Sequence, residues 1–290
     1  MRIFFLLFYF VTTSVSIAQE SLINFSEDDL KFLRYLQKTK QYHQFETYFR
    51  YVDPEDQSFT VRNELLYLKA GNAYYQKNLQ LAADLFLDVN RGFSRYEESR
   101  FFAAYCLSHS NKVKESEQLL EDLIIEDPII KELKDFQQAG NALLSRDLNK
   151  FRGLSKNFTY QHYALMGEEE KLIDYYQELK DFKPKSMVLA GLMSAVIPGS
   201  GKIYTGKVGE GIAALLTIGV LGTITAENYI KAGLGNYKTI FFGSIFSVFY
   251  LGNIYGSMVS VKVYRQEFNE TIDQGILFSM HIPIRNVFLK

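Results

Sequence analysis

An uncharged run of sequence lies close to the C-terminal end of the chain. Residues 239–261 contain no Asp, Glu, Lys or Arg, and a helix of that length can cross a bilayer with some tilt. Two shorter uncharged stretches, 186–201 and 211–226, precede it. They are marginal in length for a crossing, and fit tilted helices, a re-entrant pair or buried core helices. The sequence therefore predicts a hydrophobic membrane domain of two or three helices at 184–261, followed by a polar tail at 262–290.

The first residues have the three regions of a secretory signal peptide. Met1 and Arg2 supply a positive end, residues 3–11 are apolar, and Ser16-Ile17-Ala18 precedes Gln19 as a small-x-small cleavage site. An uncleaved N-terminal helix is the alternative, although the apolar run is short for a span. We predict a signal peptide at 1–18 and an exported mature chain that begins at Gln19.

Composition argues against several kinds of chemistry. The formal net charge of −1 offers no field to attract nucleic acid. Cys106 is the only cysteine, so neither an intramolecular disulfide nor a thiolate metal cluster can form, and its apolar neighbours predict a core position. The four histidines are not paired at metal-ligand spacing, and no nucleophile-elbow or zinc-protease motif is present. We predict no catalytic, cofactor or metal residues and no nucleic-acid partner.

Apolar residues at helical spacing fill the region 19–183. Two amphipathic helices on either side of residues 38–41 form a first pair. A second pair spans 65–75 and 79–89, and a third spans 100–109 and 113–125. The pairs recur at roughly 30–37 residues, which is typical of a stacked array of helix–turn–helix units.

The pairs resemble the tetratricopeptide repeat. The best copy is Ala70-Gly71-Asn72-Ala73-Tyr74-Tyr75 followed by Ala82 and Phe86, and Ala104, Leu107, Ser116, Leu120, Leu123 and Pro128 keep the family spacing. A fourth copy starts at Ala139-Gly140-Asn141-Ala142-Leu143, and 160–182 is a candidate fifth pair. We expect repeat packing through Gly71, Tyr74, Ala82, Phe86, Ala104, Ser116 and Pro128. The resemblance implies a solenoid whose concave surface binds proteins or peptides; a rigid spacer is the alternative.

A glycine-rich turn joins the first two uncharged stretches. Residues 201–207 match half of a phosphate-binding loop, but Val208 stands where Ser or Thr must bind magnesium, and no strand precedes it. The turn is instead similar to the P-G-x-G-x-x-Y-x-G signature of small bacterial membrane domains with a helical hairpin, through Pro198, Gly199, Gly201, Tyr204 and Gly206. In this interpretation proline ends a helix, glycines allow close backbone packing, and the tyrosine lies at headgroup level.

Small residues spaced by four follow in the long uncharged run. Gly252, Gly256 and Ser260 form a small-xxx-small pattern that lets membrane helices pack closely. Their partner is either the 211–226 helix or another copy of the chain, and the sequence leaves both open. We predict that Asn253 supplies an interhelical hydrogen bond.

Three crossings would place Lys202, Lys207 and Arg265 in the cytoplasm and residues 19–183, with Lys185, outside it. In the tail, the pattern predicts an amphipathic helix at about 262–271 and a strand at 276–284.

Together these features predict an all-α protein: a tetratricopeptide-like solenoid at 19–183, then a transmembrane hairpin domain of two or three helices. The leading functional hypothesis is a scaffold or assembly protein in the inner membrane of a Gram-negative-type bacterium, whose repeat domain docks a protein or peptide in the periplasm. The alternative is a component of a transport or channel system, with Glu210 as the acid nearest the membrane turn.

Overall fold

The computed structural model describes residues 26–288, and every regular element among them is a helix. The chain divides into two compact units, one ending at Ser110 and the other beginning at Asn111. The predicted all-α class is therefore confirmed for the described residues. The predicted signal peptide lies outside them.

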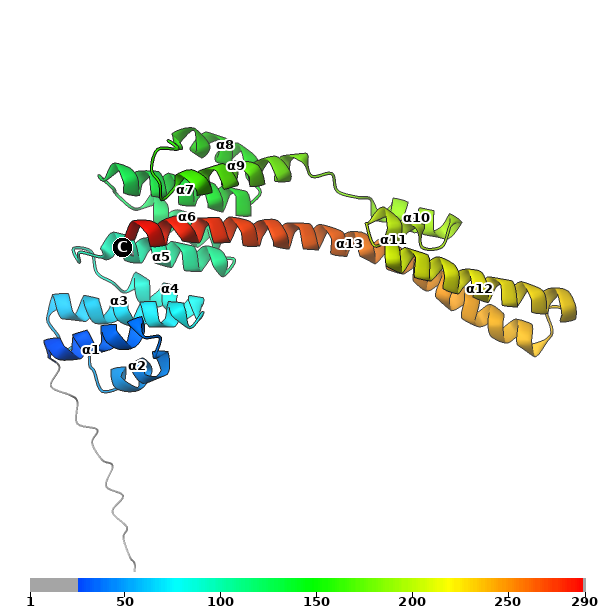
Figure 1. The fold of residues 1–290 in the computed structure, drawn as a ribbon, viewed down its shortest axis with the longest axis horizontal. Helices are drawn as coiled ribbons and strands as arrows, with labels where there is room; N and C mark the ends of the chain where they lie inside the picture. The colour runs from blue at the N-terminus through cyan, green and yellow to red at the C-terminus, as the bar shows by residue number, and fades with distance from the viewer. Residues whose placement is uncertain (1–25, 289–290) are drawn as a thin grey trace, which may run out of the picture. The chain divides into compact units, whose positions relative to one another are not determined.

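From residue 26 to Ser110 the first unit consists of five helices: α1 (Glu27–Lys38), α2 (Tyr42–Phe49), α3 (Phe59–Tyr75), α4 (Leu79–Leu87) and α5 (Tyr96–His109) (Figure 1). Helix α1 begins at a capping box, in which the Ser26 side chain accepts from the Asp29 amide and the Asp29 carboxylate accepts from the Ser26 amide. At the other end of the unit, the buried Arg100 guanidinium on α5 donates to the carbonyl oxygens of Phe86, Leu87 and Val89. It thereby satisfies carbonyls that helix α4 leaves open at its C-terminus.

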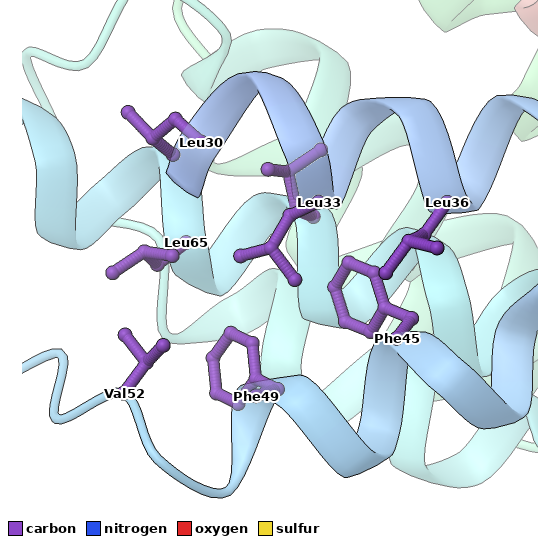
Figure 2. Packing of buried hydrophobic residues seen from close by; sticks show 8 residues of the cluster. Leu30, Leu33, Leu36, Phe45, Phe49, Val52 and Leu65 are labelled. Atoms are coloured by element: carbon purple, nitrogen blue, oxygen red, sulfur yellow. The ribbon is translucent and has the colours of Figure 1, made fainter. Parts of the chain in front are cut away.

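A buried apolar cluster holds α1, α2 and α3 together. Figure 2 shows side chains from the three helices converging on one another: Leu30, Leu33, Leu36, Phe45, Phe49, Val52 and Leu65. The three leucines of α1 are spaced by three, so they share one face of the helix. These contacts confirm the predicted first pair of amphipathic helices on either side of residues 38–41.

The same turn recurs along the array of helix pairs. Lys40, Lys77, Asn111 and Arg146 each adopt a positive φ of 61° or 62° between a longer and a shorter helix. Successive members are 37, 34 and 35 residues apart. At three of the turns the next amide closes back onto the preceding helix, as in Asn78 N–H to the Ala73 carbonyl. The backbone thus repeats at the period that the sequence predicts.

The second unit holds the remaining elements: α6 (Val113–Glu121), α7 (Pro128–Leu144), α8 (Leu148–Leu154), the 3₁₀ turn η1 (Ser155–Asn157), α9 (Met166–Asp181), α10 (Met187–Val196), α11 (Ser200–Tyr204), α12 (Val208–Ala232) and α13 (Tyr237–Phe288). Helix α13 contacts α10, α11 and α12 and also α7 and α9 (Figure 1). One helix therefore belongs both to the hydrophobic hairpin and to the packing of the helix pairs.

Two predictions for this unit are wrong. The predicted strand at 276–284 is part of α13, which buries Ile276, Met280 and Ile284 at helical spacing. The candidate fifth pair at 160–182 is the single helix α9. The tail beyond residue 261 is helical and packs on α7 and α9, so the second compact unit includes residues from both sides of the expected domain boundary between 183 and 184.

Helices α12 and α13 are long and apolar enough to cross a membrane, and in each only 11% of the most apolar window is buried. Helix α10, with 10 residues, is about 15 Å long and too short to cross a hydrocarbon core of ~30 Å.

Candidate functional site

The predicted glycine turn lies where α10, α11, α12 and α13 meet. The Ser186 side chain caps α10 by accepting from the Leu189 amide, and α10 ends just before Pro198. Gly199 then adopts φ +83°, a backbone conformation that residues with a side chain rarely adopt, and α11 begins at the next residue. Gly206 closes α11 with φ +90°. Proline and glycine thus shape a helix–turn–helix corner.

Two glycines of the turn let backbones touch. A Cβ atom on Gly199 would lie 1.9 Å from the carbonyl oxygen of Gly211 on α12. A Cβ atom on Gly201 would lie 2.0 Å from the carbonyl oxygen of Ala190 on α10. Neither position has room for any side chain, so the glycine spacing is required by the approach of α11 to both neighbours.

A buried polar network closes this corner against α13. The Ser194 hydroxyl shares a hydrogen bond of 2.7 Å with the Ser257 hydroxyl and accepts from the Gly201 amide at 2.9 Å. Asn253 accepts from the Gly199 amide at 3.1 Å and donates to the Ser194 carbonyl at 3.3 Å. The predicted interhelical hydrogen bond of Asn253 is confirmed. In an apolar environment such fully paired groups fix one geometry, because an unpaired one is costly.

The small residues of α13 occupy different environments. Ser260 accepts from the Thr205 hydroxyl at 3.0 Å and so joins α13 to α11. A Cβ on Gly256 would lie 3.8 Å from the Lys202 side chain, whereas one on Gly252 would meet nothing within 4 Å. Gly252 instead lines a cavity between α12 and α13, beside the Lys202–Glu210 ion pair.

Tyr204 lies in a cluster of aromatic and basic residues, which come from the segment before α10 and from the middle of α13. The Lys185 ammonium donates to the Tyr204 carbonyl at 2.7 Å and lies over the Tyr264 ring, 4.3 Å from its centroid. Arg265 donates to the Lys185 carbonyl, and Phe182 stacks on Phe268 with centroids 3.8 Å apart. Three crossings would separate Lys185 from Arg265 by the whole bilayer; their contact contradicts that arrangement. The spacing of residues in the sequence could not predict this cluster, because Lys185 and Arg265 are 80 residues apart.

The C-terminal half of α13 docks on α7 and α9 through close contacts. A Cβ on Gly140 would lie 2.5 Å from the Met280 sulfur, and a Cβ on Gly275 would lie 2.5 Å from the Tyr175 hydroxyl. The buried Gln137 amide donates to the Met280 carbonyl at 2.7 Å, in the turn where Pro283 lacks an amide hydrogen.

The predicted repeat-packing residues lie mostly in the interior. Gly71, Ala82, Phe86, Ala104 and Ser116 are buried, Tyr74 is half-buried, and Pro128 is exposed. Pro128 is the first residue of α7, after the Asp127 cap, and does not close the preceding helix. Two equivalent asparagines make equivalent contacts: Asn72 donates to Glu46 on α2 at 2.6 Å, and Asn141 donates to Ser116 on α6 at 2.9 Å.

One carboxyl pair lies outside these contacts. The fully buried Glu169 accepts from the Tyr160 amide, and Glu132 accepts from the Thr159 amide and hydroxyl. Burial, then hydrogen bonding and repulsion by Glu132, raises the pKa of Glu169 to about 7. The two carboxyl groups thus accept hydrogen bonds from the loop at 159–160 and hold it.

Among residues 26–288, no three His, Cys, Asp or Glu side chains gather as a metal site. Burial raises the pKa of the Cys106 thiol to about 12, so it is a poor nucleophile.

Comparison with known proteins gives one short match. An uncharacterized protein of Methanocaldococcus jannaschii is 44% identical over 50 residues, which is 17% of this chain and 46% of that protein. The chain thus spans about half the length of that curated relative. No protein-family model matches the chain, and no solved structure matches it.

Proposed function

We propose that this chain is a membrane-anchored interaction protein, in which α12 and the first half of α13 form a two-span hairpin. The observation that carries the proposal is the apolar surface of these helices: Leu216, Val220, Ile230, Phe241, Val248 and Leu251 are each more than half exposed. A contiguous surface of this kind is unfavourable in water and favourable in a bilayer.

The packing of α13 supports two crossings. Its C-terminal half contacts α7 and α9, while its N-terminal half pairs with α12. The helix pairs at 113–181 and the C-terminal residues must then lie on one side of the membrane. Helix α10 exposes Val188, Leu192 and Val196. We propose that it inserts into the membrane from the side of the helix pairs and does not cross.

For the remainder of the chain we propose a tetratricopeptide-like array that binds a protein or peptide partner, with a scaffold or assembly role. The recurring positive-φ turns and the equivalent asparagines at 72 and 141 support a repeat. Exposed aromatic residues on α1 and α3, among them Tyr35 and Phe59, offer contact area of the kind that interfaces favour.

We further propose that the array lies in the periplasm of a Gram-negative-type cell, with the hairpin in the inner membrane, because the first 18 residues match a signal peptide. The contacts around Lys185 and Arg265 bring basic residues to the array side, and the positive-inside bias favours the opposite orientation. Paired alkaline phosphatase and fluorescent-protein fusions after residue 290 distinguish the two; phosphatase activity supports the proposal, and fluorescence alone refutes the periplasmic location.

The anchor is tested by Val220→Arg, at the middle of α12. Arginine at the centre of a span costs about 3 kcal/mol, or roughly 100-fold in the insertion equilibrium. We expect the variant chain to leave the membrane pellet on carbonate extraction. Ile124→Arg is the matched control, because Ile124 is 84% exposed in the loop after α6. If both variants remain in the pellet to the same extent as the unaltered chain, the hairpin is not the anchor.

The partner is tested by photo-crosslinking in intact membranes, with the crosslinker at Tyr35 or Phe59 and, as control, at Lys231 near the hairpin tip. A discrete product from the first two sites alone supports docking on the array; products independent of position contradict it.

The transport alternative gains little support, since Glu210 lies in the first turn of α12 and is paired with Lys202. A solute flux that Glu210→Gln abolishes would favour the transport alternative over the interaction proposal.

A further inference from the structure

Two adjoining open hollows lie between helices α12 and α13. The first, of about 460 Å³, contains Lys202, Glu210, Ala214 and Gly252 in its lining, and the second, of about 450 Å³, is lined by Leu216, Val220, Leu221 and Ile245, among others. Thr217 and Phe249 line both, so the two form one continuous furrow.

Small residues keep the furrow open. Ala213, Ala214 and Gly252 form its walls near the charged end. A Cβ on Gly252 would meet no atom within 4 Å, so glycine is not required there for helix packing. The space at Gly252 is therefore available to something other than this chain's own side chains.

The furrow is charged at one end only. The Lys202 ammonium and the Glu210 carboxylate lie 3.3 Å apart, with the side chains 22% and 57% exposed. Asn253 also reaches the lining, but its amide is already bonded to Gly199 and Ser194. Beyond Thr217 the lining is apolar. Recognition of a polar group is therefore confined to the ion pair.

The length of the furrow matches one leaflet. Glu210 and Leu221 are eleven residues apart on α12, about 16 Å at the helical rise, and half of a ~30 Å hydrocarbon core is about 15 Å. Because Glu210 lies in the first turn of α12, the charged end is at the headgroup level and the apolar end is near the bilayer centre.

We propose that this furrow binds one acyl chain of a zwitterionic phospholipid with a primary-amine headgroup, as in phosphatidylethanolamine; this inference rests on the membrane anchoring proposed above. The headgroup ammonium pairs with the Glu210 carboxylate, and the phosphate pairs with the Lys202 ammonium. A primary ammonium donates charge-assisted hydrogen bonds to a carboxylate, whereas the trimethylammonium of phosphatidylcholine has no hydrogen to donate. The site therefore distinguishes the two lipids by one hydrogen-bonded contact.

The test uses the full chain in nanodiscs of equal parts phosphatidylethanolamine, phosphatidylcholine and phosphatidylglycerol, followed by native mass spectrometry of the lipid that stays bound. Gly252→Leu places a side chain in the furrow at a position where a Cβ meets no atom within 4 Å, and we expect about a tenfold loss of retained phosphatidylethanolamine, the cost of excluding about two methylene groups. Gly219→Leu is the matched control on α12, because a Cβ there also meets nothing within 4 Å and the residue lies outside the furrow lining. Glu210→Gln should abolish the preference for phosphatidylethanolamine over phosphatidylcholine while an acyl chain is still retained.

Equal lipid retention by Gly252→Leu and Gly219→Leu would overturn the site, and retention of phosphatidylglycerol above phosphatidylethanolamine would overturn the headgroup assignment. Carbonate extraction of the same variants separates this result from the anchoring proposal. A chain that remains in membranes but shows no selective lipid refutes the furrow alone, and a chain that is extracted refutes the anchor.

Discussion

Replacing Gly201 by alanine should open the corner between α10 and α11. The added Cβ would lie 2.0 Å from the Ala190 carbonyl oxygen and 2.7 Å from the Ser194 hydroxyl, well inside the 3.0 Å that real Cβ contacts respect. The nearest obstacle is backbone and not the end of a flexible side chain, so the two helices must separate by about 1 Å or more.

The free-energy cost can be estimated from the contacts that this separation removes. Overpacking at a rigid contact costs about 1–3 kcal/mol. Separation also lengthens the 2.9 Å hydrogen bond from the Gly201 amide to Ser194 and the 2.7 Å bond from Ser194 to Ser257. Each contributes about 1 kcal/mol net. Alanine recovers about 1 kcal/mol of helix propensity in α11. The balance is a loss of about 2–4 kcal/mol in the local opening free energy.

Hydrogen exchange of the amides at 187–206, measured on the full chain in nanodiscs, reports this opening directly. A loss of 2–4 kcal/mol predicts exchange that is about 30-fold or more faster. Gly209→Ala is the control: it lies in α12, and its added Cβ meets nothing within 4 Å. It should leave exchange unchanged or slower. If Gly201→Ala exchanges like Gly209→Ala, the close backbone approach is absent and the role given to the turn glycines fails.

Three further predictions concern the second unit and the core. Glu169 has a folded-state pKa of about 7 against 4.5 for an ordinary glutamate, so its stabilising contribution is complete below pH 4.5 and is lost as pH rises through 7. Glu169→Gln, which can donate to Glu132, should remove most of a fall of up to about 3 kcal/mol between pH 5 and pH 8.5, measured as chemical unfolding of that unit. Arg146→Ala removes a partly exposed ion pair of 2.6 Å with Asp273, worth about 1 kcal/mol, and should speed hydrogen exchange of residues 269–288 several-fold. Cys106 should resist maleimide at pH 7.5 and react on denaturation; fast labelling of the folded chain would contradict its burial.

Local periodicity predicted α1 and α2 because each of these two helices has one apolar face. The three leucines of α1 and the two phenylalanines of α2 are spaced for a single interior, and the structure buries them together. Asn253 was also predictable, since a lone amide in an apolar run requires a partner.

The tail was predicted wrongly because its sequence fits two periods. Ile276, Phe278, Met280 and Ile284 alternate like a strand, but Ile276, Met280 and Ile284 are also spaced by four. Only the packing against α7 and α9 selects the helix: those three are fully buried, and Phe278 is 62% exposed. Pro283 lies inside α13, and the Gln137 side chain donates to the Met280 carbonyl in the turn that the proline interrupts.

The buried face of α13 explains how a single helix serves two environments. Asn253, Ser257 and Ser260 face α10 and α11, and further along the helix Ile272 and Ile276 are buried where α13 packs on α7 and α9. The chemical character of the buried residues differs between these two parts. In the hairpin the buried side is polar and the exposed side apolar, which suits a bilayer; in the tail the buried side is apolar, which suits water. The change falls between residues 261 and 272, where Tyr264 and Arg265 belong to a cluster of the aromatic and basic type that membrane interfaces favour. For the hairpin proposed above, this change in the buried face of α13 would set its depth in the membrane, independently of the hydropathy of the exposed face.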